Sequence, residues 1–307
     1  MRVFVAGATG AIGRRLVPRL VEAGHEVTGM TRSPERAEAL RAAGADPVVA
    51  DVFDVPALEA AVAAARPEVV VNELTDIPRP MNPRKYAQQM AGLERIRAEG
   101  YPNLVRAAQA AGARRLVAQS ISFVYAPGAP PATEDDPLWH DAPEPFATTL
   151  RATLAGERAV LDSGLQPLVL RYGWFYGPGT SYAADGGITA AIRKRGYPIV
   201  GNGAGVSSFI HVDDAAEATV LAVASGVTGV LNVVDDDPAA LREWLPAVAA
   251  SIGAPKPRRV PAILARMAAG PIAVAFSTRQ RGVSNARAKE ALGWTPGHPT
   301  WRGTLGT

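Results

Sequence analysis

Three glycines near the start of the chain have the spacing that binds a pyrophosphate. The stretch VFVAGATGAIG places Gly7, Gly10 and Gly13 directly after an apolar run and at the start of a helical pattern. Glycine permits a tight turn at the first position, the approach of a pyrophosphate at the second and close helix packing at the third. The amides and positive dipole end of the following helix attract phosphates. We therefore predict dinucleotide binding here, rather than a turn that binds nothing, with further contacts from Thr9, Ala11 and Ile12.

A second short stretch, MTRS, indicates which dinucleotide is bound. Thr31 stands roughly where a site for NAD carries Asp or Glu to bind the ribose 2′-hydroxyl, and Arg32 follows it. A 2′-phosphate would meet a guanidinium there instead of a repelling carboxylate. The residues favour NADP(H) over NAD(H), with Arg14 as a second basic contact. The alternative is that Arg32 is an ordinary exposed arginine before a helix.

These residues need a framework of alternating strands and helices. Short apolar runs at 2–7, 25–30, 46–51, 68–73 and 114–120 predict buried parallel strands. Amphipathic stretches at 11–24, 33–44, 55–67 and 82–112 predict the helices between them, the second starting with Ser33 as N-cap before Pro34. The order predicts an α/β fold with a doubly wound parallel sheet. After Pro238 we expect two amphipathic helices separated by a loop rich in Pro and Arg.

The composition is that of an ordinary globular protein. Of 307 residues, 48% are hydrophobic and 20% are charged, and the net charge is +3. This balance disfavours disorder, and scattered arginines disfavour a nucleic-acid partner. The absence of cysteine excludes disulfides and cysteine metal sites and fits a reducing cytoplasm. No apolar run reaches the roughly 18 residues of a membrane span, so we predict a cytoplasmic protein with no membrane partner.

Acidic clusters in the chain have structural explanations. The stretches TEDDP, HVDDA and VVDDDP lack histidine clusters or carboxylate pairs at metal-ligand spacing, so no metal is predicted. Asp213 stands at a helix start and is predicted to cap that helix. His211, on an otherwise apolar strand, is predicted to be a hydrogen-bonded core residue.

Motifs in order along nearly the whole chain carry a resemblance to a known superfamily. Besides the glycine turn they are ADVFD, RRLVAQSISFVYAPG, LRYGWFYGPG, SFIHVDDAAEA, LNVVDDD and ALGWTP. Together they resemble the extended and atypical short-chain dehydrogenases/reductases, the branch known as NAD(P)-dependent epimerases/dehydratases. The resemblance implies a Rossmann fold with a smaller C-terminal substrate-binding region. It also implies cofactor contacts at Asp51, Val52, Asn72, Glu73, Leu74 and Tyr172.

The same resemblance implies a division of the chain. The cofactor-binding domain would comprise residues 1–171, completed by about 208–234, and the smaller region would comprise 172–207 and 235–307. Substrate would lie between the two. The glycine-rich stretch 176–187 is then a substrate loop, with Trp174, Tyr176 and Tyr182 as aromatic contacts.

One departure from the family pattern concerns the catalytic dyad. Active members carry Tyr and Lys four residues apart on the helix after the fifth strand, the tyrosine as acid/base and the lysine lowering its pKa. Aligning that helix on Glu157 puts Thr149 and Thr153 at these positions. A threonine hydroxyl is too weak an acid for this role, and no cation stands beside it. The usual proton donor is therefore missing.

Other side chains remain as catalytic candidates. They are Ser120, Ser122, Tyr125, Tyr172, Tyr176 and His140. Either serine could orient a substrate carbonyl or merely bond the backbone at a strand end, and the loop histidine could be a base or simply solvated.

Three functions remain open. The first is an NADP(H)-dependent oxidoreductase or epimerase-like enzyme acting on a small organic molecule with a non-standard proton source. The second is a non-catalytic NADP-binding sensor, and the third is an isomerase, lyase or cyclase on the same fold. A homodimer through the helices at 82–112 and 147–163 is also predicted, although Pro102 interrupts the first.

Overall fold

A seven-stranded parallel sheet forms the centre of the computed structural model, which describes residues 1–77 and 82–307. Its order is β11-β6-β5-β4-β1-β2-β3, and every neighbouring pair is parallel. The strands are β1 (Arg2–Ala6), β2 (Glu26–Thr31), β3 (Asp46–Val49), β4 (Val69–Asn72), β5 (Arg115–Ile121), β6 (Gln166–Tyr172) and β11 (Gly229–Val233). The predicted doubly wound α/β fold is confirmed. Because β1 lies between β2 and β4, the strand order reverses beside the glycine turn, where open sheets bind ligands.

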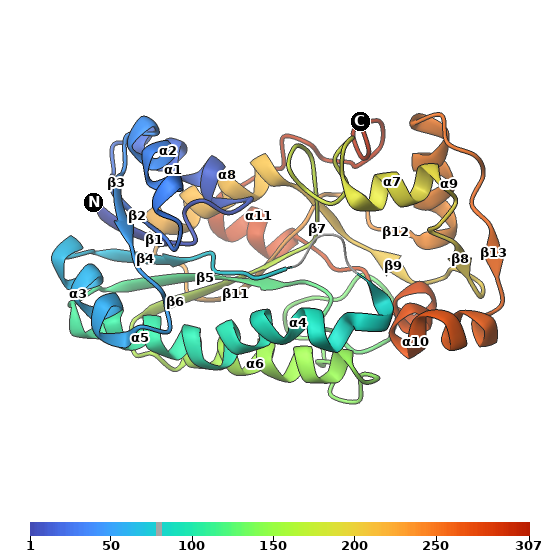
Figure 1. Cartoon of the computed structure of the whole chain (residues 1–307), viewed down its shortest axis with the longest axis horizontal. Coiled ribbons are helices and arrows are strands. Elements are labelled where there is room, and N and C mark those ends of the chain that lie inside the picture. Colours follow the sequence, from blue (N-terminus) through green and yellow to red (C-terminus); the bar gives the residue numbers. More distant parts are fainter. Residues whose placement is uncertain (78–81) are drawn as a thin grey trace.

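Helices cover both faces of this sheet (Figure 1). One face carries α1 (Gly13–Glu22), α2 (Ala37–Ala42), α8 (Val212–Ala224) and α11 (Ala286–Leu292). The other carries α3 (Val55–Ala65), α4 (Tyr86–Arg95), α5 (Tyr101–Ala110) and α6 (Phe146–Leu161). Short 3₁₀ turns precede α2 and α4, at η1 (Pro34–Arg36) and η2 (Pro83–Lys85). The strands are therefore buried from both sides, as their near-continuous apolar sequences predict.

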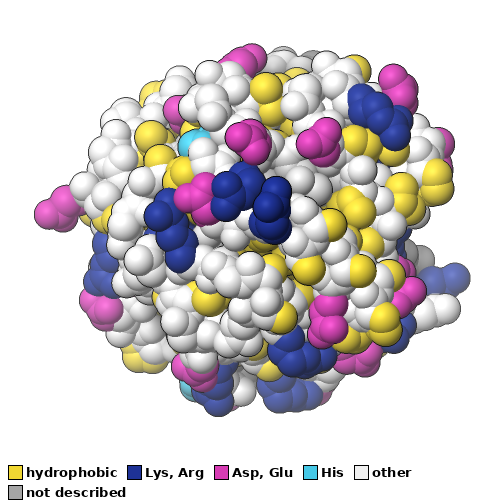
Figure 2. All heavy atoms as spheres, turned by 90° about the vertical axis from the view of Figure 1, so that its left-hand side faces the viewer, with side chains coloured by type: hydrophobic (Ala, Val, Ile, Leu, Met, Phe, Trp, Pro, Cys, Tyr) yellow, Lys and Arg dark blue, Asp and Glu magenta, His cyan; other side chains and the backbone are white. Residues whose placement is uncertain are grey.

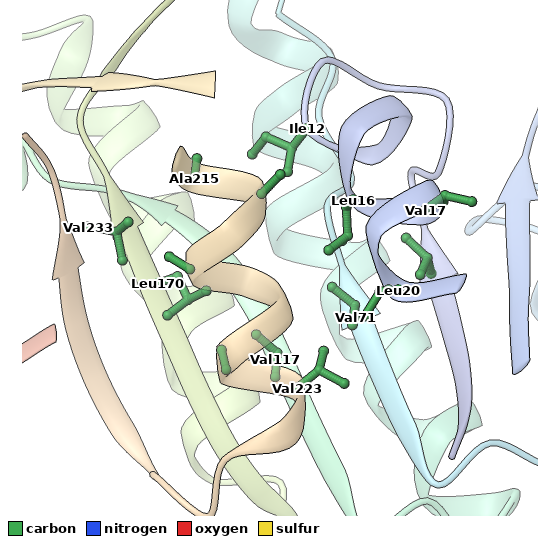
Figure 3. Packing of buried hydrophobic residues seen from close by; sticks show 14 of the residues in the cluster. Ile12, Leu16, Val17, Leu20, Val71, Val117, Leu170, Ala215, Val223 and Val233 are labelled. Carbon is green, nitrogen blue, oxygen red and sulfur yellow. The ribbon is translucent and has the colours of Figure 1, made fainter. Parts of the chain in front are cut away.

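The packing of α1 against α8 fills the first face of the sheet. Figure 3 shows Leu16 and Leu20 of α1, Val71 and Val117 of the sheet, and Val223 of α8 converging between the helices and the strands. All five side chains are buried. Burial of such side chains stabilises the fold by roughly 1.5–3 kcal/mol each. This core holds the amino-terminal end of α1, and hence the glycine turn, against the sheet.

The helix predicted over 82–112 is divided in the structure. A π-helical turn, η3 (Ile96–Gly100), joins α4 to α5, and the Tyr101 amide donates to the Ile96 carbonyl five residues back. Pro102 has no amide to continue an α-helical ladder, so the chain widens just before it. The stretch is thus helical as predicted, and its regular α-helical ladder is interrupted before Pro102. The homodimer through these helices stays a prediction.

The chain after β6 adds short strands and helices with a separate core. Two-residue and three-residue pairings join β7 (Trp174–Tyr176) to β10 (Phe209–His211), β8 (Ile199–Val200) to β13 (Arg259–Val260), and β9 (Val206–Ser207) to β12 (Ala239–Ala240). The helices are α7 (Gly187–Arg193), α9 (Leu241–Ser251) and α10 (Ala262–Arg279). Trp244, Trp301, Phe209 and Tyr182 are buried together in this core. The two helices predicted after Pro238 are α9 and α10.

The start of α8 corrects the predicted role of Asp213. The N-cap is His211, whose Nδ1 accepts the Asp213 amide at 3.3 Å. The Asp213 carboxylate instead pairs with Arg15 at 3.2 Å and Arg19 at 3.0 Å. The extended backbone of His211 directs its ring at the helix terminus, while two arginines of α1 attract the carboxylate.

The surface charge is mixed on the face that Figure 2 presents. Basic and acidic side chains are interspersed there over the end of the molecule that lies at the left of Figure 1. Among the helices of the described residues, none is long and apolar enough to cross a membrane. Location in the cytoplasm stays a prediction.

A buried ion pair joins α6 to the sheet. Arg171 of β6 forms two hydrogen bonds to Glu157 of α6, at 2.9 and 2.6 Å, and both side chains are 5% exposed. Desolvated charges of this kind depend on each other, since removing one leaves the other unpaired in a medium of low polarity.

We expect Glu157→Ala to lower the free energy of unfolding by about 3–5 kcal/mol, because Arg171 would lose its buried partner. Urea denaturation followed by circular dichroism measures this change. The control is Glu144→Ala, which removes the partner of Arg151 from an exposed pair with a separation of 2.9 Å. Its cost should be below about 1 kcal/mol. Equal losses in the two variants would contradict the assignment of Glu157 as a structural anchor.

Candidate cofactor and substrate site

The glycine turn leaves backbone exposed where the strand order reverses. Gly7 has φ +85°, and a Cβ there would lie 2.5 Å from the Glu73 carbonyl oxygen. A Cβ on Gly13 would lie 2.4 Å from the Gly7 carbonyl oxygen. A Cβ on Gly10 would meet only that same oxygen, at 3.2 Å. Two glycines thus close the turn against β4 and α1, whereas Gly10 keeps its outer side free of described atoms, which is the cradle that a pyrophosphate needs.

The amino terminus of α1 faces this cradle without a side-chain cap. Ile12 is the N-cap residue and makes no capping hydrogen bond, and the first turn holds no acidic residue. Arg14 is exposed, and its Nη2 lies 3.1 Å from the Cβ position of Gly179 in the substrate loop. Arg15 donates to the Pro178 carbonyl at 2.7 Å. The helix dipole and Arg14 therefore supply positive charge between the turn and this loop, whereas the charge of Arg15 is paired with Asp213.

Thr31 and Arg32 differ in their environment. The Thr31 side chain is buried, and its hydroxyl lies 3.2 Å from the Thr9 hydroxyl and accepts the Ser33 amide. Arg32 is exposed, and no hydrogen bond or ion pair ties its side chain to another described residue. Ser33, expected to cap the next helix, instead donates its hydroxyl to Glu35. The Arg32 guanidinium is thus available to a ligand at the end of β2.

The residues expected to contact the cofactor lie at the ends of β3 and β4. The Asp51 carboxylate accepts the Phe53 amide at 2.9 Å, and Val52 is buried. The Asn72 side chain accepts the Leu74 amide at 3.2 Å. These contacts shape the loops at the carboxyl edge of the sheet. The turn, the uncapped helix and these loops together fit a dinucleotide.

Glu73 is a buried carboxyl group at the same edge. Its side chain receives a 3.4 Å hydrogen bond from the Tyr172 hydroxyl, and its second oxygen has no partner among the described residues. Burial raises the pKa of Glu73 to about 8, so the group is mostly protonated at neutral pH. The Tyr172 hydroxyl also lies 2.6 Å from the Thr219 hydroxyl, and burial raises its pKa well above the usual value. Neither group presents a charge to the site.

Thr149 and Thr153, which the sequence alignment places at the dyad positions, make hydrogen bonds within the protein. Thr149 donates to Glu94 of α4 at 2.6 Å, and Thr153 donates to the Thr149 carbonyl at 2.8 Å. Both side chains are buried. The Tyr86 hydroxyl shares a further hydrogen bond with Thr149, and burial raises the pKa of Tyr86 to about 12. No side chain in this group is a good acid at neutral pH.

The catalytic candidates near β5 are mostly engaged. Ser120 donates to Glu157 at 2.5 Å, inside the buried ion pair. The Tyr125 hydroxyl accepts from Arg171 at 2.9 Å and donates to Asn232 at 2.8 Å. Burial raises the pKa of Tyr125. Ser122 differs, because its buried hydroxyl makes no hydrogen bond with a described residue.

The remaining candidates lie in different surroundings. Tyr176 is fully buried, and its hydroxyl donates to the carbonyls of His298 and Thr300 at 3.3 Å. Burial raises its pKa well above the usual value. Tyr182 lies with Tyr176 in the core of the carboxyl-terminal region, whereas His140 is exposed. The two tyrosines are therefore core residues, and only His140 lies at the surface.

An aromatic surface beside Ser122 was not identified from the sequence. Phe123 and Trp174 stack with ring centres 4.3 Å apart and an interplanar angle of 3°, and Phe276 of α10 meets both edge-on. Phe123 and Trp174 are partly exposed. Of the three aromatic residues predicted to contact substrate, Trp174 lies in this surface. Phe276 is distant in sequence, so only the tertiary structure reveals the group.

The structure also brings together a cluster of two histidines and an aspartate that could not be recognised from their spacing in the sequence. Ligand atoms of His211, Asp214 and His298 lie within 4.8 Å of one another, the two rings stacked at 3.7 Å. Each member has a protein partner, since His298 bonds Asp214 at 3.2 Å and His211 caps α8. Desolvation and the His298 charge lower the pKa of His211. These contacts account for the cluster as a structural connection between α8 and the carboxyl-terminal segment.

Comparisons with known proteins agree with this geometry. The model of the family described as "NAD dependent epimerase/dehydratase family" matches residues 3–233. A 3-diazoavenalumate denitrifying reductase from Streptomyces sp. is 51% identical over 100% of this chain and 99% of its own. UDP-glucose 4-epimerase from Mycolicibacterium smegmatis is 30% identical over 96% of this chain and 94% of its own. The solved structure of UDP-glucose 4-epimerase from Thermus thermophilus in complex with NAD is similar, with a TM-score of 0.74 and 25% identity, over 99% and 96% of the two chains.

The pKa of Glu73 leads to a test of stability against pH. The folded protein holds this proton up to about pH 8, whereas an unfolded chain releases it near the ordinary pKa of 4.5. The contribution of Glu73 to stability is therefore fully present below about pH 4.5 and is lost as the pH rises through 8.

We expect Glu73→Gln to be more stable than the wild type by about 2–4 kcal/mol at pH 9 and similar to it at pH 5, because the amide cannot ionise. Chemical denaturation at both pH values measures the difference. Glu59→Gln, at an exposed position of α3, is the control and should change neither value. A difference that is the same at pH 5 and pH 9 would refute the protonated carboxyl.

Proposed function

The chain belongs to the NAD-dependent epimerase/dehydratase family, and we propose that it is an NADP(H)-dependent reductase that transfers a hydride to the diazo group of a small aromatic acid. That it is an enzyme with a nicotinamide dinucleotide cofactor and a small-molecule substrate follows from its relatives. The observation that carries the finer proposal is the loss of the dyad, with Thr149 and Thr153 both engaged in internal hydrogen bonds.

The preference for NADP(H) follows from charge at the end of β2. Arg32 is exposed there without a partner among the described residues, and Thr31 brings no carboxylate against a 2′-phosphate. Ser33 and Arg36 lie in the same short segment and add polar and basic character. In this assignment Gly7, Gly10 and the amides of Ala11 and Ile12 hold the pyrophosphate. When bound, the nicotinamide supplies the hydride.

The lost dyad restricts which substrates the site can reduce. A ketone that accepts a hydride becomes an alkoxide and needs a proton, which a tyrosine beside a lysine normally supplies. Tyr86 has a pKa of about 12 and shares its hydroxyl with Thr149, so it is a poor replacement. An electrophile whose reduction consumes no proton avoids this requirement.

A diazo group is such an electrophile. When hydride attacks an arenediazonium ion, a C–H bond forms with the hydride's electron pair, and the C–N bond breaks with its pair leaving on dinitrogen. The substrate is reduced by two electrons, its positive charge is neutralised, and no proton enters or leaves. The 51% identity to a relative named as a denitrifying reductase of a diazo acid supports this reaction for the present chain.

The aromatic surface gives this substrate a place to bind. The stacked rings of Phe123 and Trp174, with Phe276 edge-on, suit a flat ring whose diazo carbon must meet the nicotinamide face. Ser122, beside them, is the hydroxyl that we assign to orienting the substrate. We assign residues 172–207 and 235–307 to the substrate-binding region and 1–171 with about 208–234 to the cofactor domain, since Trp174 and Phe276 come from the former.

Isotopic labelling tests the reaction. Wild-type enzyme with NADPH carrying deuterium at C4 should convert 4-carboxybenzenediazonium to benzoate with deuterium on the ring, with one dinitrogen released per NADPH oxidised. The unlabelled cofactor in D₂O should give no ring deuterium. Both C4 epimers of the label are needed, and a reaction without enzyme corrects for spontaneous reduction. No enzyme-dependent turnover, or ring deuterium derived from solvent, would refute the proposal.

Two variants belong to this experiment. Thr149→Ala should retain activity within about threefold, because no general acid is required. Gly10→Val should abolish cofactor binding, since its side chain would fill the cradle. An inactive Thr149→Ala enzyme with normal cofactor affinity would show that the threonine is catalytic.

Cofactor choice has its own test. We expect NADP(H) to bind more tightly than NAD(H) by about 1–3 kcal/mol, through a charge-assisted contact with Arg32. Calorimetric titration of both cofactors measures the preference. Arg32→Ala should remove most of it, whereas Arg41→Ala, an exposed arginine of α2 paired with Glu38 at 3.0 Å, should preserve it. Equal affinities in the wild type, or an unchanged preference in Arg32→Ala, would overturn the assignment.

A further inference from the structure

Arg97 is a buried arginine without a carboxylate partner among the described residues. Its side chain is 1% exposed, and its Nε and Nη1 atoms have no hydrogen-bond partner in that part of the chain. The two other buried arginines of the described residues are held differently. Arg171 has the Glu157 carboxylate, and Arg115 donates to Ala222, Ser225 and Val227. A desolvated guanidinium without acceptors is costly, so its persistence indicates a ligand as partner.

The backbone of Arg97 places its side chain beside the dyad positions. The Arg97 carbonyl oxygen lies 3.2 Å from the Cβ position of Gly156 in α6. Glu94, one turn before Arg97, meets Thr149, two turns before Gly156, so α4 with η3 and α6 run side by side in the same direction (Figure 1). Helical side chains lean toward the amino terminus of their helix. The guanidinium therefore extends from the level of Gly156 toward Thr153 and Thr149.

Two aromatic residues bracket the Arg97 guanidinium. Its carbon lies 6.0 Å from the centre of the Tyr101 ring, and the positive charge of Arg97 acts on the hydroxyls of both Tyr101 and Tyr86. Tyr86 is the residue that bonds Thr149. Arg97 thus brings a cation to the part of the site where the family's lysine is absent, from the neighbouring helix.

The π-helical turn explains why this arginine can reach so far inward. Arg97 is the second residue of η3, where the extra residue per turn shifts the side chains relative to a regular helix. Gly156, across from it, has no side chain, and an added Cβ there would lie 3.0 Å from Tyr101 and 3.5 Å from the Arg97 Cβ. The turn and the glycine together seat Arg97 against α6.

The surrounding acidic groups do not neutralise Arg97. Glu157 is already paired with Arg171, Glu73 is mostly protonated at neutral pH, and Glu94 accepts from Thr149 without forming an ion pair with Arg97. The pyrophosphate cradle is built by the glycine turn after β1, on other elements. The charge of Arg97 is therefore not compensated by a carboxylate of the described residues.

We propose that Arg97 binds an anionic oxygen of the substrate, a carboxylate or a phenolate, and thereby holds an aromatic acid in the site. Entry of this oxygen requires the partly buried Tyr86 side chain to move aside. The inference rests on the proposed function for the identity of the aromatic acid, but its test uses binding and needs no hydride transfer.

The experiment measures the affinity of the NADP⁺-loaded enzyme for 4-hydroxycinnamate, its methyl ester and cinnamate by calorimetry. The ester lacks the carboxylate and cinnamate lacks the phenol, so the pair distinguishes the two sources of anionic oxygen. The wild type should bind 4-hydroxycinnamate at least about 30-fold more tightly than one of the two analogues. Arg97→Met should reduce this preference to below about threefold, and Arg97→Lys should restore part of it.

Controls separate this role from folding and from cofactor binding. Arg97→Met should keep the NADP⁺ affinity and raise the thermal midpoint by a few degrees, because it removes an unpaired buried charge. Arg95→Met, which removes an exposed arginine paired with Glu99 at 3.0 Å, should keep the ligand preference. A wild type that does not discriminate among the three ligands, a preference that survives in Arg97→Met, or a tenfold loss of NADP⁺ affinity in that variant would overturn the proposal. Failure of the diazonium reaction alone would overturn the proposed function and leave this inference standing.

Discussion

The buried pair of Glu157 and Arg171 is the interaction on which the reactive half of the structure depends. It joins α6 to β6, receives Ser120 from β5 and extends through Tyr125 to Asn232 of β11. It thereby ties α6 to three strands that the backbone hydrogen bonds of the sheet already hold in register. Because charges in this environment tolerate little displacement, α6 must keep its place whether or not it carries a catalytic dyad.

The residues of α6 that hold the helix in place differ from those at the dyad positions, so the dyad positions can change while the helix stays where it is. The helix keeps Glu157 as a structural group but carries threonine at both dyad positions, and their hydroxyls close hydrogen bonds to Glu94 and to the helix backbone. Tyr86, Arg97 and Glu94 from the adjacent helix occupy the surroundings instead. The cation stays near the site, but the acid is lost, which favours substrates that require charge recognition more than protonation.

Much of the cofactor half could be predicted from the sequence, because its signals are local. The glycine spacing, the apolar strand runs and Arg32 after β2 each depend on neighbouring residues, and the parallel sheet follows from them. The N-cap of α8 was harder to predict, because His211 and Asp213 are both near the start of the helix. Arginines of α1, distant in sequence, pair with the Asp213 carboxylate, and His211 caps the helix instead. Burial of Tyr176 and Tyr182 likewise depends on segments over 60 residues away.

Arg97 shows most clearly what could not be predicted from the sequence. The helical pattern over 82–112 gives no reason to single out this arginine, because the position of the π turn cannot be recognised from that pattern. Pro102 carries the signal, because a helix that lacks one amide must widen or break. The widening directs Arg97 toward α6, where Gly156 leaves room for it. In the proposed role of Arg97, Pro102 thus influences which charge lies beside Thr149 and Thr153, and this cation comes from a different helix than the lysine of the family pattern.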